Sequence, residues 1–177
     1  MKSRDISQQF IELHTAQSDT LFRYCFFRVS DRDIALDITQ DSFMRLWNTM
    51  VKTSIGGSHE HIKNPKALLF KIASNLIIDW YRKKKTVSLD AYLDGDTEEY
   101  PFQFYDTSHE QIEIQSEGKL ILKHLATLDA TYQHVVYLRF VEDMPPKDIA
   151  EITGLSVNVV SVRINRGLQE LRKKYGL

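Results

Sequence analysis

The chain has 177 residues, 42% of them hydrophobic, and a formal net charge of −1. That length suits one medium domain or two small helical ones with real hydrophobic cores. No apolar run approaches the roughly 20 residues that span a bilayer, and no signal-peptide core follows the N-terminus. We therefore expect a soluble, cytoplasmic protein with no membrane insertion. The single cysteine, Cys25, excludes an internal disulfide and lies among aromatic residues, which favours a buried, inert thiol.

Charge is distributed unevenly along the chain. Residues 1–85 carry 14 basic and 9 acidic side chains, residues 86–118 carry 9 acidic ones and no Lys or Arg, and residues 119–177 carry 9 basic and 6 acidic ones. With helical periodicity on both sides, this predicts an all-α fold: two small helical domains, 1–85 and 119–177, joined by an acidic linker, 86–118. Two basic modules favour nucleic-acid contacts, and the linker itself would repel DNA. A merely solvating tether explains the linker's charge equally well.

The N-terminal module begins with a helical stretch that runs to about Val29. We expect Ser30 to cap a second helix that continues to about Met50, with acids in its first turn. On that helix Phe43 and Leu46 fall on the buried face. A polar stripe falls largely on another face, where periodicity alone predicts ordinary solvated surface; it contains Asp37, Gln40 and Asp41.

A third helix should be capped by Asn64 and begin at Pro65. Its apolar residues form two adjacent rows, Leu68, Ile72, Leu76 and Trp80 in one and Leu69, Ala73 and Ile77 in the other. The helix ends in the run Trp-Tyr-Arg-Lys-Lys-Lys, residues 80–85. Cationic residues beside aromatic ones suit a nucleic-acid backbone with stackable bases. A basic helix end that only satisfies the helix dipole is the alternative.

Residues 145–174 predict two helices joined by a three-residue turn. Pro146 suits the first helical position, Gly154 ends the first helix, and Ser156 caps the second. The second helix buries the row Val160, Ile164, Leu168 and Leu171 and carries Ser161, Arg163, Asn165 and Arg166 on its opposite face. This arrangement is typical of a DNA-reading helix-turn-helix. An ordinary helical hairpin with solvated arginines is the alternative.

Three segments together resemble a known family, the bacterial RNA polymerase sigma factors of the extracytoplasmic-function (ECF) type within the sigma-70 family. Asp-Ile-Thr-Gln-Asp-Ser-Phe-Met-Arg-Leu-Trp, residues 37–47, resembles the family's polymerase-docking stretch. Asn-Pro-Lys-Ala-Leu-Leu-Phe-Lys-Ile-Ala-Ser-Asn, residues 64–75, followed by Asp79 and Arg82, resembles its promoter-melting helix. Residues 128–171 resemble its C-terminal helix-turn-helix, so the similarity covers nearly the whole chain.

The resemblance implies that the first domain, sigma region 2, binds the clamp helices of the polymerase's largest subunit and reads and melts the −10 promoter element. The docking residues would be Asp37, Gln40 and Asp41, supported by Phe43 and Leu46. The loop at about 51–63 and the third helix would capture a flipped −10 base, because a base can be read individually only once it is unstacked. The −10 residues would be Asn64, Lys71, Asn75, Arg82, Lys83, Lys84 and Lys85.

The last domain, sigma region 4, would read the −35 element as duplex. The residues implied are Ser161, Val162, Asn165 and Arg166, with Arg163 better placed for a phosphate. The chain has no ATP-binding motif, so the free energy for opening DNA would come from binding. We expect no enzyme activity, cofactor or metal. The partners implied are core RNA polymerase, promoter DNA and an anti-sigma factor that holds such proteins inactive.

Several residues depart from the family pattern. Leu68 replaces a usual Trp, so Phe70 or Trp80 would have to supply any stacking surface, and Ser74 replaces an Arg expected to contact phosphate. Val159 and Val162 replace hydroxyl residues, which lessens polar contacts in the groove. Gly167 replaces a usual Ala and costs about 1 kcal/mol of helix stability unless close packing requires it. The promoter sequence therefore cannot be transferred from the family.

Two other classes of function compete with this one. A stand-alone helix-turn-helix regulator would bind palindromic sites as a dimer and use the N-terminal half as a sensor. A metal enzyme would need a site at His59-Glu60-His61 with His109 or Glu110, but this cluster lacks the spacing of a recognisable zinc site.

Overall fold

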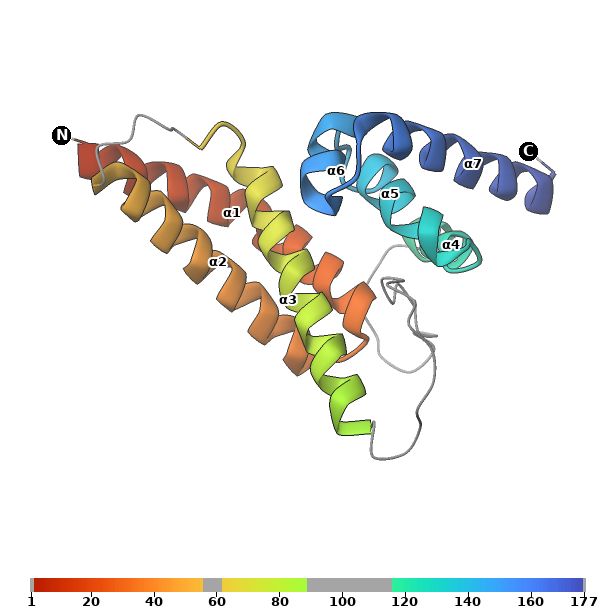
Figure 1. Cartoon of the computed structure of the whole chain (residues 1–177), viewed down its shortest axis with the longest axis horizontal. Helices are drawn as coiled ribbons and strands as arrows, with labels where there is room; N and C mark the ends of the chain where they lie inside the picture. Colours follow the sequence, from red (N-terminus) through yellow and green to blue (C-terminus); the bar gives the residue numbers. More distant parts are fainter. Residues whose placement is uncertain (1, 56–61, 89–115, 177) are drawn as a thin grey trace. The chain divides into compact units, whose positions relative to one another are not determined.

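The computed structural model describes residues 2–55, 62–88 and 116–176, which are helical and contain no strand. The chain divides into two compact units, residues 1–80 and 81–177 (Figure 1). Helices α1 (Lys2–Val29), α2 (Arg32–Ile55) and α3 (Pro65–Ser88) precede α4 (Ser116–Leu125), α5 (Ala130–Phe140), α6 (Pro146–Thr153) and α7 (Val157–Tyr175). The all-α prediction is confirmed. Most of the predicted acidic linker, and the histidines proposed for a metal site, lie outside the described residues.

In the first unit α1 and α2 run side by side in opposite directions, and α3 lies across α1 (Figure 1). Aromatic side chains join α1 to α2: the ring of Phe10 lies 5.0 Å from Trp47 and 6.1 Å from Phe43, in edge-to-face geometry. Such pairs add about 0.5–1.5 kcal/mol beyond the area they bury. The ring of Phe70 in α3 lies 5.1 Å from Tyr24 in α1, and this pair joins the third helix to the core.

The α1–α2 connection differs from the prediction. Ser30 has a positive φ of 53°, and its N–H donates to the Phe26 carbonyl at 2.8 Å, so it ends α1. Asp31 caps α2 instead, because its carboxylate accepts hydrogen bonds from the N–H groups of Asp33 and Ile34 at 3.0 and 3.1 Å. The predicted Ser30 cap is therefore wrong by one residue. The helix also continues about five residues beyond Met50, to Ile55.

A buried polar cluster lies between α1 and α3. The guanidinium of Arg28, 4% exposed, donates to the Tyr24 hydroxyl at 2.8 Å and to the Ser74 hydroxyl at 3.3 Å. Burial raises the pKa of Tyr24 above its ordinary value, although Arg28 acts in the opposite direction. Cys25 is also buried, as predicted, and this burial raises the pKa of its thiol to about 12, which disfavours the reactive thiolate.

In the second unit the local signals in the sequence correspond to the observed helix ends. Pro146 begins α6, Gly154 ends it in the left-handed conformation with a φ of 73°, and the Ser156 hydroxyl accepts from the Val159 N–H at 3.3 Å at the start of α7. Val160 and Ile164 are buried against the rest of the unit, with Leu168 and Leu171 half-buried beside them. The predicted helix-turn-helix geometry is confirmed.

Candidate nucleic-acid and protein interfaces

The polar stripe of α2 lies on the side of the helix away from its core residues. Asp37 and Gln40 are exposed and Asp41 is half-buried, whereas Phe43 and Leu46 are buried. The stripe can therefore meet a partner while the two apolar residues hold the helix in place. This is the division of roles that the resemblance implies for these five residues.

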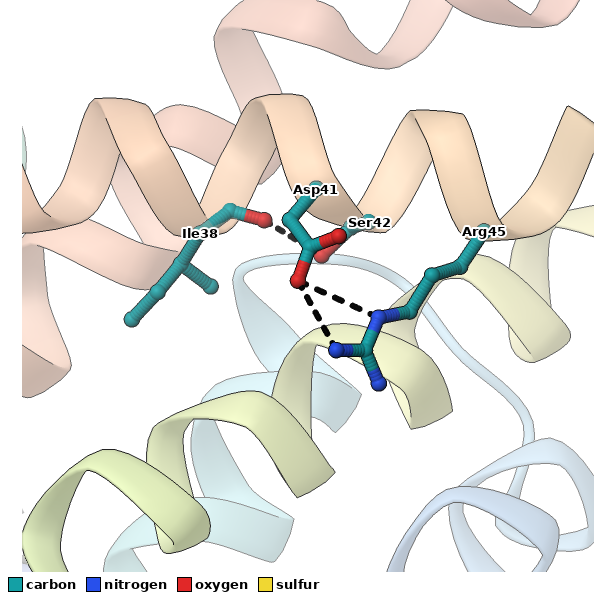
Figure 2. A network of polar contacts seen from close by, with 4 residues as sticks. All are labelled: Ile38, Asp41, Ser42 and Arg45. Atoms are coloured by element: carbon teal, nitrogen blue, oxygen red, sulfur yellow. Dashed lines mark hydrogen bonds and ion pairs between the residues drawn. The ribbon is translucent and has the colours of Figure 1, made fainter. Parts of the chain in front are cut away.

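Asp41 forms an ion pair within α2. Its Oδ2 lies 3.0 Å from Nη2 and 3.1 Å from Nε of Arg45, one turn further along, as Figure 2 shows. Both side chains are about half exposed, so this i, i+4 pair stabilises the helix by only about 0.3–0.5 kcal/mol. The same figure shows the Ser42 hydroxyl donating to the Ile38 carbonyl, at 2.6 Å, so Ser42 faces inward. Asp41 is thus paired with Arg45 and still accessible.

Met44 belongs to the same surface, although its apolar character gave no reason to select it from the sequence. It is 64% exposed, the largest exposure among the large hydrophobic residues of the described structure. It follows Gln40 by four residues and Asp41 by three, which places it one helical turn beyond them on the same face. An apolar side chain exposed within a polar stripe indicates a contact surface, but its exposure becomes known only from the structure.

On α3 the structure divides the predicted −10 residues into two groups. Lys71, Asn75 and Arg82 are exposed at spacings of four and seven residues, so they form one stripe about 16 Å long along the helix. Lys83 and Lys84 are also exposed and lie on other sides of its last turns, while the side chain of Lys85 lies outside the described structure. A stripe of this length on one side of the helix suits contact with several nucleotides of one strand better than the lysine run alone does.

Asn64 has a structural role as the cap of α3. Its Oδ1 accepts from the Ala67 N–H at 2.9 Å, as its position before Pro65 predicts. The carbonyl group that a base could otherwise use is already engaged. Asn64 is therefore a weaker candidate for direct contact with DNA than Lys71 or Asn75.

Two interpretations of the departures on α3 need correction. Phe70 is 0% exposed and packs on Tyr24, so it cannot offer a stacking surface; of the two residues considered, half-buried Trp80 is the better placed. Ser74 is 3% exposed and accepts a hydrogen bond from Arg28. Position 74 is buried and does not face solvent. The structure therefore does not support the interpretation that Ser74 removes a phosphate contact.

The exposed face of α7 lies opposite Val160, Ile164 and Gly167. Val162, Asn165 and Arg166 are exposed near its centre, whereas Ser161 and Arg163 are half-buried at its edges. The sequence-based prediction missed Asn158 and Gln169, which are exposed on the same face, about one turn before Val162 and two turns after it. Their amides carry both donors and acceptors, the groups that read adenine edges. Both residues could have been predicted from the sequence, because helical periodicity places them opposite the buried row of Val160 and Ile164.

Arg163 lies near the beginning of α5. The carboxylate of Asp129 caps α5 by accepting from the Thr131 N–H at 2.8 Å. Hydrogen bonding to the Thr131 side chain, followed by that to its N–H, is the main reason that the pKa of Asp129 lies below its ordinary value. The positive charge of Arg163 lowers that pKa further. Arg163 is thus at the edge of the α7 face, near an acid of its own domain, which fits a phosphate contact better than a base contact.

In the described part of the chain, no three His, Cys, Asp or Glu residues are grouped as a metal site would require. None of its helices is both long and apolar enough to cross a membrane.

Comparison with known proteins identifies the family. The model of sigma-70 region 2 matches residues 13–87, and that of sigma-70 region 4 matches residues 119–171, which together make up more than two thirds of the chain.

Among relatives, the RNA polymerase sigma factor SigV of Bacillus subtilis is 28% identical over 89% of this chain and 86% of its own length. The ECF RNA polymerase sigma factor SigW of the same organism is 27% identical over 93% and 88%. The sigma factor RpoE of Bartonella quintana, solved in complex with the anti-sigma factor NepR, has a similar fold, with a TM-score of 0.65 at 21% identity over 94% of this chain and 96% of that one. The chain belongs to the ECF sigma factors of the sigma-70 family.

Proposed function

We propose that this protein binds core RNA polymerase and directs it to promoters, with the α7 face reading the −35 element as duplex and α3 capturing the melted −10 element. The observation that carries the proposal is the geometry of α7. Its buried row and its exposed face of Asn158, Val162, Asn165 and Arg166 leave hydrogen-bonding and cationic groups where base edges and phosphates lie in a major groove.

Helices α2 and α3 supply the other two functions. The stripe of α2, Asp37, Gln40 and Asp41 with Met44, would dock on the clamp helices of the polymerase's largest subunit. The stripe of α3, Lys71, Asn75 and Arg82, would follow a single strand once the −10 element has opened. The exposed Lys83 and Lys84 add positive charge near the end of the same helix. Promoter opening would draw its free energy from these contacts and would take place in the cytoplasm, where the polymerase acts.

An anti-sigma protein is a second class of partner. The support is that the RpoE protein of Bartonella quintana, whose fold this chain shares, was solved in complex with an anti-sigma factor. Purification of the tagged full chain from its native host, followed by identification of bound proteins, tests this. Recovery of core polymerase alone, under both growth and stress conditions, would contradict it.

The central test is a selection of genomic DNA fragments by three samples: the protein with core polymerase, the protein alone, and core polymerase alone. We expect only the first sample to enrich one shared sequence with two parts separated by a constant spacing, and to transcribe from it. The matched control is Glu170→Gln, an exposed change on α7 toward its C-terminal end. Enrichment of a palindromic site by the protein alone would instead establish a stand-alone regulator.

A further inference from the structure

The α7 face exposes two valines that the predicted hydrogen-bonding contacts leave unexplained. Val159 is 40% and Val162 48% exposed, and they stand three residues apart on the helix. Counting about 100° per residue, Val162 lies about 160° from Ile164, at the centre of the solvent-facing side. Its neighbours on that side are Asn158, Asn165 and Arg166. The centre of a surface suited to reading base edges is therefore apolar.

The position of the valines suggests what they contact. The beginning of a recognition helix is the part that approaches base edges, and both residues lie within the first six of α7. The apolar group that a base displays in the major groove is the C5-methyl group of thymine. Side chains at i and i+3 have Cβ atoms about 5–6 Å apart, which suits contact with one thymine methyl group together or with the methyl groups of two adjacent base pairs.

We propose that Val162 and Val159 read thymine methyl groups in the −35 element, so that this protein selects A·T pairs by apolar contact at the centre of its recognition helix. This proposal rests on the proposed function and adds to it the chemical group that is recognised. Asn158 and Asn165 stand beside the valines, and their amides can read the adenine partners of the same thymines or of neighbouring ones.

The test uses holoenzyme assembled from the full chain and core polymerase, on the promoter recovered by the selection described above. Each −35 thymine, on either strand, is replaced in turn by deoxyuridine, which pairs in the same way and lacks only the methyl group. We expect one or two replacements to weaken binding about threefold to fivefold. Burying one methyl-sized group contributes about 0.8 kcal/mol to binding. Because a tenfold change in affinity corresponds to about 1.4 kcal/mol, losing this group weakens binding about fourfold.

Variants then assign the contact to its residue. Val162→Ala and Val159→Ala should fold normally, because both sites are exposed and alanine is the better helix former. In at least one of them the difference between thymine and deoxyuridine should disappear at one position. Val157→Ala is the matched control: Val157 is also 44% exposed on α7, but it lies about 140° around the helix from Val162, so this variant should keep the full difference.

Three results would overturn the proposal: a −35 element without an A·T pair, equal binding of thymine and deoxyuridine at every −35 position, or a difference that both alanine variants retain in full. These are distinct from failure of the proposed function, in which the holoenzyme would recover no promoter at all.

Discussion

Gly167 of α7 lies so close to Val136 of α5 that no side chain fits between the two helices. A Cβ atom added at Gly167 would lie 2.7 Å from Cγ2 of Val136 and 3.1 Å from Cβ of Tyr132. Close packing therefore explains why glycine stands where the family usually has alanine, despite the helix stability that glycine costs. Close approach of α5 and α7 holds the recognition helix against its domain.

We predict that Gly167→Ala destabilises the second unit. Overpacking costs about 1–3 kcal/mol, while alanine returns about 1 kcal/mol of helix propensity, so the net loss should reach at most about 2 kcal/mol. Urea unfolding followed by circular dichroism measures it. The control is Gln169→Ala, an exposed change on the same helix. In a Val136→Ala background, which removes the facing methyl groups, Gly167→Ala should cost less than it does in the parent, and a Gly167→Ala protein more stable than the parent would contradict the packing argument.

Replacing Asp41 by Lys should weaken binding to core polymerase. The substitution places a positive charge where the proposed partner surface would meet an acid, and it also sets two like charges at i, i+4 with Arg45. The structure provides a control for the second effect. Arg45→Gln removes the ion pair but leaves Asp41 accessible and negative, so it should bind core at least as well as the parent. Competition against a labelled sigma factor for core measures both; equal affinity of the Asp41→Lys protein would remove this residue from the interface.

Met44 should contribute to docking through apolar burial. Because it is 64% exposed in the free protein, Met44→Ala should leave the unfolding midpoint nearly unchanged. If the side chain becomes buried on the polymerase, the same change should weaken core binding by about 1–2 kcal/mol. The matched control is Ile11→Ala, which changes an apolar residue on α1 that is 57% exposed and lies outside the stripe. A similar loss for both variants would point to general surface hydrophobicity instead.

The Asp129 cap should make the second unit sensitive to acid. Its pKa is lower in the folded protein than the ordinary 3.8, chiefly because of hydrogen bonds from Thr131. This stabilisation is therefore present above the unfolded pKa and is lost as pH falls through the lower folded one. Asp129→Ala should cost about 1 kcal/mol at pH 7 and flatten the pH dependence of stability below about 4. Glu170→Ala, which removes an exposed acid from within α7 and away from any helix N-cap, serves as control in the same unfolding series.

The parts of the fold that depend on neighbouring residues in sequence could be predicted, and those that depend on facing helices could not. Pro146, Gly154 and Ser156 end or cap helices through their own backbone and hydroxyl chemistry, so their roles followed from residue type. The inward position of Phe70 and the contact at Gly167 depend on α1 and α5, which no local pattern specifies. Ser30 and Asp31 are both good caps by composition, and only the positive φ of Ser30 decides between them.

The two basic surfaces should differ in what they contribute to promoter binding. Arg166 is exposed on the α7 face, where a bidentate contact to guanine is worth about 1–3 kcal/mol. Arg166→Ala should therefore weaken holoenzyme binding by that amount and relax the base preference at one −35 position. The half-buried Arg163 is the comparison, because as a phosphate contact its loss should leave base preference unchanged.

Neutralising Lys83, Lys84 and Lys85 to Gln should instead weaken binding to all promoter sequences alike. Each lost phosphate contact should reduce the slope of log affinity against log salt by about one unit, because fewer counterions are released on binding. Filter binding of holoenzyme at several salt concentrations, on promoters with single −35 substitutions, measures slope and preference together. If the lysine variant changed −35 base preference as much as Arg166→Ala does, the assignment of −35 reading to α7 would be wrong.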